Sequence, residues 1–421
     1  MSLQGPIIVV ADAPVPWLLE RLAGAGAFPL VEARGHQVAE ATRSVQPAAI
    51  VLADPDALAD PAVGDALEDA LAAGQLFVPV IACVRGDAAS TFGPALPIDA
   101  DAPAARLIAR LRAALRVRTL HGSVLRRAAS LRESGADAPD MPDGDPLDDA
   151  TVIVTGRGRA YPALTVTFGE RVGLTGALSL EAASRVLHGR DIDGVVIGDG
   201  FSKRMVEAFL AELGADARFR DLPVGVLEDL ATDIDPERLP NLERVIGDPA
   251  RIADRVLPLV RIHAFAGRLR RMGTSLDAKG VVDPHTGLRT RAAFMRDLTH
   301  AVAHAADRGD GLALARITLA DPEDSRLSLD AARIVARLMR TSDFACRDHD
   351  GTILVAFTDT GLGPAHVVAR RIASVLKHTA LAPGRERGTL DTSVAIAALN
   401  GRDTVDTLIA RVAPDGMVAT G

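Results

Sequence analysis

Short apolar runs alternate with longer amphipathic stretches along the first two thirds of the chain. Apolar runs between turn signals are typical of buried strands, and the stretches between them have the three-and-four spacing of helices. Strands are predicted at Pro6–Val10, Ala48–Ala53, Phe77–Val84, Thr151–Thr155, Arg171–Leu174, Gly194–Ile197 and Pro223–Leu227. Helices are predicted at Val15–Leu22, Ala104–Leu115, Leu180–Leu187, Lys203–Leu213 and Ala250–Val260.

This strand and helix order occurs twice, which indicates an internal repeat of architecture. Strands that alternate with helices at this spacing form parallel sheets with helices on both faces. We therefore expect two doubly wound, flavodoxin-like α/β domains, over residues 1–133 and 150–282. The segment between them, residues 134–149, is acidic, rich in Pro and Gly and without periodicity, which predicts a flexible linker.

A long helical pattern ends each predicted domain. Arg106–Glu133 is strongly basic and carries a stripe of leucines, which favours packing against another helix, in the same chain or in a partner subunit. Alternatively, the arginines could simply solvate a helix on the protein surface. That would explain the positive charge of the helix but not its stripe of leucines. Arg261–Val282 is predicted to be a connecting helix to the last third of the chain.

The last third, residues 283–421, predicts an α+β domain. An amphipathic helix at Ala331–Met339 leads into a hairpin, whose turn is marked by Asp350–Gly351 and whose second strand is Ile353–Phe357. Further strands are predicted at Leu312–Leu319 and Leu390–Ala397, and a short last helix at Thr404–Val412.

Composition excludes some classes of function. The net charge of −8 and the absence of basic runs mixed with aromatic residues argue against nucleic-acid binding. Neither cysteine, Cys83 or Cys346, has a CxxC neighbour, so both should be small buried hydrophobic residues. No signal peptide or membrane-spanning stretch is evident, and we expect a cytoplasmic protein.

Each predicted α/β domain resembles the receiver domain of response regulators. In that register the phosphoacceptor position falls at Ala53 in the first domain, one residue before Asp54, and at Asp199 in the second. Phosphoryl transfer to aspartate needs neighbouring acids that hold Mg²⁺, and a lysine. The lysine positions are Ala100 and Val245. Asp54 and Asp199 are therefore expected to be vestigial phosphoacceptors. We expect Asp54 to be a turn residue and Asp199 to be a residue at the end of a strand. A regulator that is phosphorylated at Asp199 stays an alternative.

The last domain resembles GGDEF domains in three places. The segment from Asp283 to Phe294 keeps Thr-Gly-Leu, an arginine and a phenylalanine of the family's opening motif. The RxxD motif is present as Arg340-Thr341-Ser342-Asp343, six residues ahead of the signature. The signature itself is replaced, because G-G-D-E-F becomes His349, Asp350, Gly351, Thr352 and Ile353.

The resemblance implies that the domain does not catalyse. Active GGDEF domains condense two GTP molecules into cyclic di-GMP, and acids hold two Mg²⁺ ions on the triphosphate. In this chain Arg316 and Thr318 stand at the family's DxD positions. We expect no enzyme activity, no metal site and no cofactor.

The resemblance also implies a ligand. Arginine can donate to O6 and N7 of guanine, and a carboxylate can accept from N1 and N2, so Arg340 and Asp343 could clamp one guanine of cyclic di-GMP. The RxxD motif alone is weak evidence for a ligand site, because the same motif also begins at Arg190, Arg218, Arg251 and Arg347. The register favours Arg340, and Arg371 matches a helix position where the family often has a supporting ligand contact.

As a whole the chain resembles receiver–receiver–GGDEF response regulators of the PleD type, in a catalytically degenerate form. That resemblance implies a cyclic di-GMP receptor and adaptor, linked to regulated proteolysis in the cell cycle. It further implies protein partners such as protease-delivery factors, a homodimer and a polar location in the cell. The competing hypothesis is a ligand-independent dimeric scaffold, which the basic helix Arg106–Glu133 favours.

Overall fold

The computed structural model describes residues 4–54, 56–85, 90, 92–133, 143–227, 234–245, 247–278, 280–308, 311–319, 325–340, 342–378, 392–401 and 403–413. The chain divides into two compact units. One contains residues 1–126 and 144–269, and the other contains residues 127–143 and 270–421. The predicted domain boundaries stay predictions.

The first lobe is a five-stranded parallel sheet in the order β2-β1-β3-β4-β5. The strands are β1 (Gln4–Val10), β2 (Phe28–Ala33), β3 (Ala49–Leu52), β4 (Val80–Val84) and β5 (Leu96–Asp99). The helices are α1 (Pro16–Gly24), α2 (Val38–Val45), α3 (Pro61–Ala72) and α4 (Ala104–Glu133). Buried apolar clusters line both faces of the sheet, which explains why the central strands β3 and β4 consist of apolar residues alone.

The second lobe repeats this architecture, with the order β10-β9-β8-β6-β7. Its strands are β6 (Thr151–Thr155), β7 (Gly173–Ala177), β8 (Gly194–Ile197), β9 (Val224–Val226) and β10 (Leu242–Arg244). Its helices are α5 (Ala160–Gly169), α6 (Leu180–Gly189), α7 (Lys203–Ala215) and α8 (Pro249–Asp277). Both orders are the doubly wound, flavodoxin-like order, so the expected fold of the two lobes is confirmed. Their assignment as receiver domains stays a prediction.

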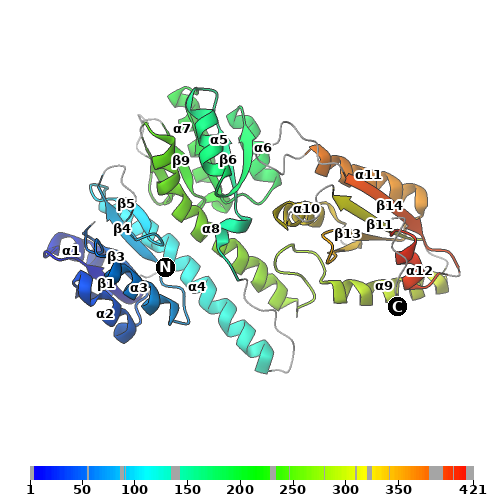
Figure 1. Cartoon of the computed structure of the whole chain (residues 1–421), viewed down its shortest axis with the longest axis horizontal. Helices are drawn as coiled ribbons and strands as arrows, with labels where there is room; N and C mark the ends of the chain where they lie inside the picture. The colour runs from blue at the N-terminus through cyan, green and yellow to red at the C-terminus, as the bar shows by residue number, and fades with distance from the viewer. Residues whose placement is uncertain are drawn as a thin grey trace. The chain divides into compact units, whose positions relative to one another are not determined.

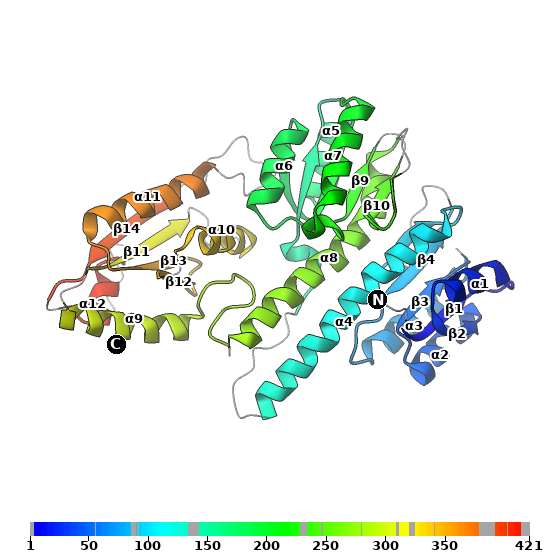
Figure 2. The ribbon, with the colours of Figure 1, turned by 180° about the vertical axis from the view of Figure 1, so that it is seen from behind.

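Helices α4 and α8 run side by side between the two sheets (Figures 1 and 2). Leu259 and Ile262 of α8 belong to the same buried cluster as Leu107 and Leu111 of α4. Farther along α8, Phe265 contacts the rings of Phe77 and His121 at centroid distances of 5.4 and 5.5 Å. The first part of the leucine stripe of α4, with Leu107 and Leu111, therefore shares a core with a helix of the same chain, and the ligand-independent scaffold stays an alternative. The predicted homodimer stays a prediction.

A buried ion cluster joins the two lobes. Glu243 of β10 lies 2.6 Å from the guanidinium of Arg110 and 2.7 Å from that of Arg255, and all three side chains are at most 5% exposed. Arg110 belongs to α4 of the first lobe, whereas Arg255 belongs to α8 of the second. The three groups satisfy one another inside the interface, because one buried carboxylate accepts from both arginines.

Three features of the first unit differ from the sequence prediction. Pro146–Asp149, at the end of the predicted flexible linker, forms a 3-10 helix. It is held to α8 because Arg268 lies 2.6 Å from Asp149; residues 134–142 of the linker lie outside the described residues. The predicted helices Ala250–Val260 and Arg261–Val282 are one helix that passes through Pro258 and ends at Asp277. Helices α2, α3 and α5 and strands β2, β5 and β10 were not predicted.

The second unit contains a four-stranded antiparallel sheet in the order β12-β13-β11-β14. The strands are β11 (Leu312–Leu319), β12 (Phe344–Arg347), β13 (Ile353–Thr358) and β14 (Thr392–Ala398). Helices α10 (Ser325–Leu338) and α11 (Leu362–His378) share one core with one face of the sheet. Helices α9 (Arg291–Arg308) and α12 (Val405–Ala410) share the core on the other face. The order β11-α10-β12-β13-α11-β14 is the βαββαβ arrangement, which confirms an α+β domain.

Both cysteines are buried, as predicted. Burial, with a smaller contribution from Asp99, raises the pKa of the Cys83 thiol to about 11. Burial also raises the pKa of Cys346, to about 12. Both thiols are therefore protonated at neutral pH and poorly reactive. Among the residues that the structure describes, no helix is long and apolar enough to cross a membrane.

Candidate functional site

The turn between α10 and β12 carries Arg340 and Asp343. Helix α10 ends at Leu338, and the backbone N–H of Asp343 donates to the carbonyl of Arg340 at 3.2 Å, which closes the turn. The side chain of Arg340 is exposed and forms no ion pair with any residue in the described part of the chain. The turn therefore presents a guanidinium whose hydrogen-bond donors are free to meet a ligand.

Asp343 is partly buried beside the end of β13. Its Oδ1 accepts a hydrogen bond from the backbone N–H of Thr358 at 3.3 Å, and the Thr358 hydroxyl donates to the carbonyl of Ser342 at 3.0 Å. Burial raises the pKa of Asp343, and the bond from Thr358 and the charge of Arg340 offset this only in part. A ligand that donates hydrogen bonds to this carboxylate would stabilise its ionised form.

Arg371 lies in α11, which packs beside α10 on the same face of the sheet. Its side chain is exposed. No hydrogen bond or ion pair between the described residues joins Arg371 to Arg340 or Asp343. Its supporting role stays a prediction.

The signature position is the tip of the β12–β13 hairpin. The tip is closed by a bond from the Asp348 N–H to the Thr352 carbonyl at 2.8 Å and by one from the Gly351 N–H to the Asp348 carbonyl at 3.1 Å. Gly351 has a φ of 77°, which a residue with a side chain would adopt only with strain. His349 is exposed, and Ile353 begins β13 in the core. The sequence correctly predicted a hairpin turn at Asp350–Gly351.

An ion pair fixes Asp350 to the sheet. Arg316 lies in the middle of β11, where it pairs in register with Leu354 and Ala395, and its guanidinium binds the Asp350 carboxylate. Asp350 also accepts bonds from the backbone N–H of Thr352 at 3.1 Å and from its hydroxyl at 2.6 Å. Burial opposes ionisation of Asp350, but these bonds and the charge of Arg316 outweigh it and lower the pKa. The Arg316 side chain is 7% exposed, so this is a largely buried cation with one acidic partner.

Two further contacts hold the hairpin tip. Ser328 of α10 is fully buried, accepts from Nε of Arg347 at 2.6 Å and donates to the carbonyl of Gly351 at 2.9 Å. Arg291 at the start of α9 lies 3.4 Å from Asp348. Sequence reasoning missed Ser328, although a serine on the apolar side of α10 was a usable signal. The tip is therefore tied to β11, α10 and α9.

We expect Asp350→Asn to lower the free energy of unfolding by about 1–3 kcal/mol, because it leaves the Arg316 cation without its carboxylate. Since the folded-state pKa of Asp350 is lowered, the stability that it provides is present above the ordinary value of 3.8 and is lost as the pH falls below it. Urea denaturation at pH 7 and at acid pH measures both effects. His349→Ala, at an exposed tip residue, is the matched control, and equal effects of the two variants would contradict the assignment.

The opening motif forms a wide turn before α9. Asp283 accepts from the backbone N–H of His285 at 3.0 Å and from the Thr286 hydroxyl at 2.6 Å. Gly287 has a φ of 76°, and its N–H donates to the Asp283 carbonyl at 2.9 Å. The next residues bring Arg291 to the hairpin tip. Asp283, Thr286 and Gly287 of this motif thus shape the turn, and Arg291 and Phe294 lie in α9.

The two vestigial phosphoacceptor candidates are both bound to nearby backbone. Asp54 follows β3, and its carboxylate accepts from the N–H of Asp56 at 3.1 Å, as expected for a turn residue. Asp199 follows β8, and its two carboxylate oxygens accept from the N–H groups of Arg159 and Ala160 at 2.9 and 3.1 Å. Asp199 thus holds the start of α5.

No family model and no curated protein matches the chain. Solved structures similar to part of it are GGDEF-domain proteins. One is the diguanylate cyclase SiaD of Pseudomonas aeruginosa in complex with its activator SiaC, at 20% identity and a TM-score of 0.31. That likeness covers 34% of this chain and 59% of SiaD, so the chain spans less than two thirds of the length of this relative.

Two other structures are similar over the same share of the chain or slightly less. The coiled coil and GGDEF domain of DgcB from Caulobacter crescentus, in complex with c-di-GMP, is 18% identical with a TM-score of 0.31, over 34% of this chain and 83% of that one. The FimX GGDEF domain of Pseudomonas aeruginosa is 19% identical with a TM-score of 0.28, over 31% of this chain and 88% of that one.

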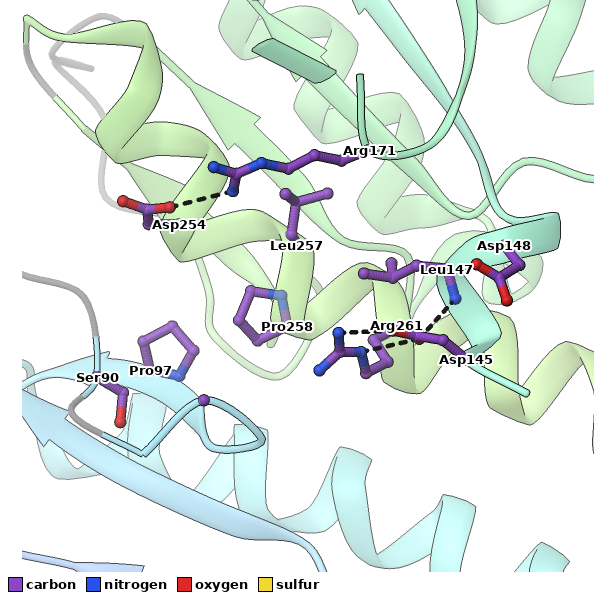
Figure 3. A pocket seen from close by; sticks show the side chains of 11 residues that line it. Ser90, Pro97, Asp145, Leu147, Asp148, Arg171, Asp254, Leu257, Pro258 and Arg261 are labelled. Atoms are coloured by element: carbon purple, nitrogen blue, oxygen red, sulfur yellow. Dashed lines mark hydrogen bonds and ion pairs between the residues drawn. The ribbon is translucent and has the colours of Figure 1, made fainter. Parts of the chain in front are cut away.

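A cleft of about 450 Å³ lies between the two lobes of the first unit (Figure 3). Its charged residues form pairs: Arg171 lies 3.3 Å from Asp254, and Arg261 lies 2.8 Å from Asp145. Asp148 also lines the cleft. With each guanidinium facing a carboxylate, this cleft has no excess of positive charge.

Proposed function

We propose that this chain is a catalytically inactive GGDEF-type protein that binds cyclic di-GMP at the turn between α10 and β12. Arg340 carries the proposal, because its guanidinium is exposed, three residues from Asp343, and without an ion-pair partner in the described part of the chain. Surface arginines in this chain often pair with a nearby acid, as Arg112 does with Glu237 and Arg261 with Asp145. An unpaired arginine beside a partly buried carboxylate suits a ligand that offers acceptors and donors together.

The edge of guanine meets that requirement. Its O6 and N7 accept hydrogen bonds from a guanidinium, and its N1–H and N2–H donate to a carboxylate. Among the described residues, the backbone N–H of Thr358 is the hydrogen-bond donor to Asp343, and it binds Oδ1. The other oxygen, Oδ2, would accept from the base.

Inactivity is proposed from the hairpin tip. In the register of the resemblance, Arg316 stands where an active domain has an acid that binds Mg²⁺, and it pairs with Asp350 at the signature. A buried guanidinium repels a divalent cation, and its partner carboxylate is already engaged. The residues present therefore do not fit the two metal ions of a cyclase.

The adaptor role is the finer part of the proposal. We propose from the family resemblance of the sequence that the chain assembles with protein partners for cell-cycle-linked proteolysis. The same resemblance is the basis for proposing a homodimer. Affinity capture of partners with and without cyclic di-GMP tests this role, and an identical set of partners in both conditions would contradict it.

Titration calorimetry with the full chain tests the binding function. We expect cyclic di-GMP to bind more tightly than cyclic di-AMP by about 5-fold to 150-fold, because adenine presents an amino donor where guanine presents O6, and one bidentate contact discriminates by about 1–3 kcal/mol. Equal affinity for the two dinucleotides, or no binding of cyclic di-GMP at tens of micromolar, would overturn the proposal.

Incubation of the chain with GTP and Mg²⁺ tests inactivity separately. We expect no cyclic di-GMP by chromatography after prolonged incubation. Product that accumulates in proportion to protein concentration would refute inactivity, while the binding proposal would still be decided by the titration.

A further inference from the structure

A hollow of about 630 Å³ lies in the first lobe between the ends of α2 and α3 and the side of α4. It is lined by the loops that precede β3 and β4, so it opens at the N-terminal edge of the parallel sheet. Ligands of doubly wound folds usually bind at the opposite edge, beyond the carboxyl ends of the strands. The hollow is therefore separate from the positions of Asp54 and Asp199, and it belongs to a different compact unit from Arg340.

The charge of this hollow distinguishes it. Arg43 and Arg118 are the charged residues among those that line it, and none of the lining residues is acidic. This is unexpected in a chain with 55 acidic and 47 basic residues. In the cleft of Figure 3, by contrast, each arginine faces an aspartate.

Arg118 is held in place by carbonyl groups. Its Nε donates to the carbonyl of Ala48 and its Nη2 to that of Pro47, both at 3.1 Å. Nη1 forms no hydrogen bond in the described part of the chain. Burial lowers the pKa of Arg118, as expected for a half-buried cation without a carboxylate partner. Two oriented carbonyls thus fix one edge of the guanidinium and leave the other edge for a ligand.

His121, one turn along α4, adds no charge to the hollow. Burial and the positive charge of Arg118 lower its pKa. Its Nδ1 accepts a hydrogen bond from the backbone N–H of Phe77 at 3.0 Å, which requires that nitrogen to be unprotonated. The neutral imidazole leaves the positive charge of the hollow to the two arginines.

The rest of the lining offers neutral polar and apolar contacts. Arg43 in the last turn of α2 is exposed and has no ion-pair partner among the described residues. Gln46 and Gln75 bring amide groups, and Leu71 and Leu76 bring apolar surface. Leu76 is 37% exposed, so part of its side chain is accessible from the hollow.

We propose that this hollow binds a small organic anion. A phosphate or carboxylate group would lie between Arg43 and Arg118, and an apolar body would cover Leu71 and Leu76. Guanidinium groups bind both kinds of anion through paired, charge-assisted hydrogen bonds, and the volume is that of a small-molecule site. The inference does not depend on the function proposed for Arg340.

Calorimetric titration of the full chain with phenyl phosphate, inorganic phosphate and phenol tests the site. We expect phenyl phosphate to bind most tightly, inorganic phosphate more weakly and phenol not at all. Arg43→Gln should weaken the binding of phenyl phosphate by about 5-fold to 30-fold, the effect of losing one hydrogen-bonded charge. Arg21→Gln, at an exposed arginine of α1, should leave it unchanged.

Arg43 is exposed, so its variant folds whether or not a ligand exists, whereas Arg118→Gln also removes bonds to two carbonyls. The proposal is overturned if phenyl phosphate fails to bind at several millimolar or if Arg43→Gln binds it as well as the natural chain. Equal affinity for phenyl phosphate and inorganic phosphate would overturn the apolar half of the site.

Discussion

Replacing Glu243 by alanine should lower the free energy of unfolding by about 3–5 kcal/mol, because it leaves the two buried guanidinium groups of Arg110 and Arg255 without a carboxylate. The loss should affect both lobes, since each arginine comes from a different one. Denaturation by urea measures it through two signals. The single tryptophan, Trp17, reports the first lobe, and the single tyrosine, Tyr161, reports the second.

The control for this prediction is Glu237→Ala. Glu237 also pairs with an arginine of α4, Arg112, at 2.6 Å, but it is 56% exposed, and such pairs contribute about 0–1 kcal/mol. Similar effects of the two variants would contradict the role given to the buried cluster.

The same cluster predicts a dependence on pH. Burial opposes ionisation of Glu243, but the charges of Arg110 and Arg255 outweigh it and lower the pKa. The stability that ionised Glu243 provides is therefore fully present above its ordinary pKa of 4.5 and is lost as the pH falls through the lowered value. Glu243→Gln should remove this contribution.

Arg340→Ala should weaken the binding of cyclic di-GMP by about 30-fold to 1000-fold, or about 2–4 kcal/mol, because it removes two charge-assisted hydrogen bonds to guanine. Asp343→Ala should weaken binding by the same route. Titration calorimetry of the variants measures both effects. Undiminished binding by Arg340→Ala would refute the site even if the natural chain binds the ligand.

The choice of control matters for this experiment. Arg347 begins an RxxD motif in the wrong register, but it also holds Ser328 and through it the hairpin tip, so its loss would disturb the domain. Arg296 on α9 is exposed and lies on the other side of the sheet. Arg296→Ala should therefore bind cyclic di-GMP as the natural chain does.

The parallel strands could be predicted from sequence because burial on both faces leaves a continuous apolar run, as in Ile50–Leu52 or Val195–Ile197. Helix α5 was missed because it contains Pro162, Thr165 and Thr167 and lacks a clear apolar stripe. The continuity of α8 was missed because a proline usually ends a helix. At Pro258 the helix continues without a break.

The candidate site was predicted in part. The motif register located Arg340 and Asp343 in one turn, since residues so close in sequence need no tertiary information to be neighbours. The contacts of Arg316 with Asp350 and of Arg347 with Ser328 span 34 and 19 residues, and they depend on how strands and helices pack. For the same reason the sequence could not predict which helix packs against the leucine stripe of α4. A helix of the same chain and a helix of another subunit would require the same apolar pattern.

The hydrogen bonds of Arg110 to two edge strands should disfavour self-association of the protein through its sheets. The guanidinium of Arg110 donates to the carbonyl of Pro97 in β5 and to those of Pro240 and Leu242 at β10, the edge strands of the two sheets. An open sheet edge is a template on which strands of other molecules can add. One arginine thus occupies carbonyls on two such edges, and Pro97 contributes no N–H of its own. Arg110 thus places one buried cation against both edge strands, β5 and β10, and a charge at a sheet edge is one of the features that oppose the addition of another strand.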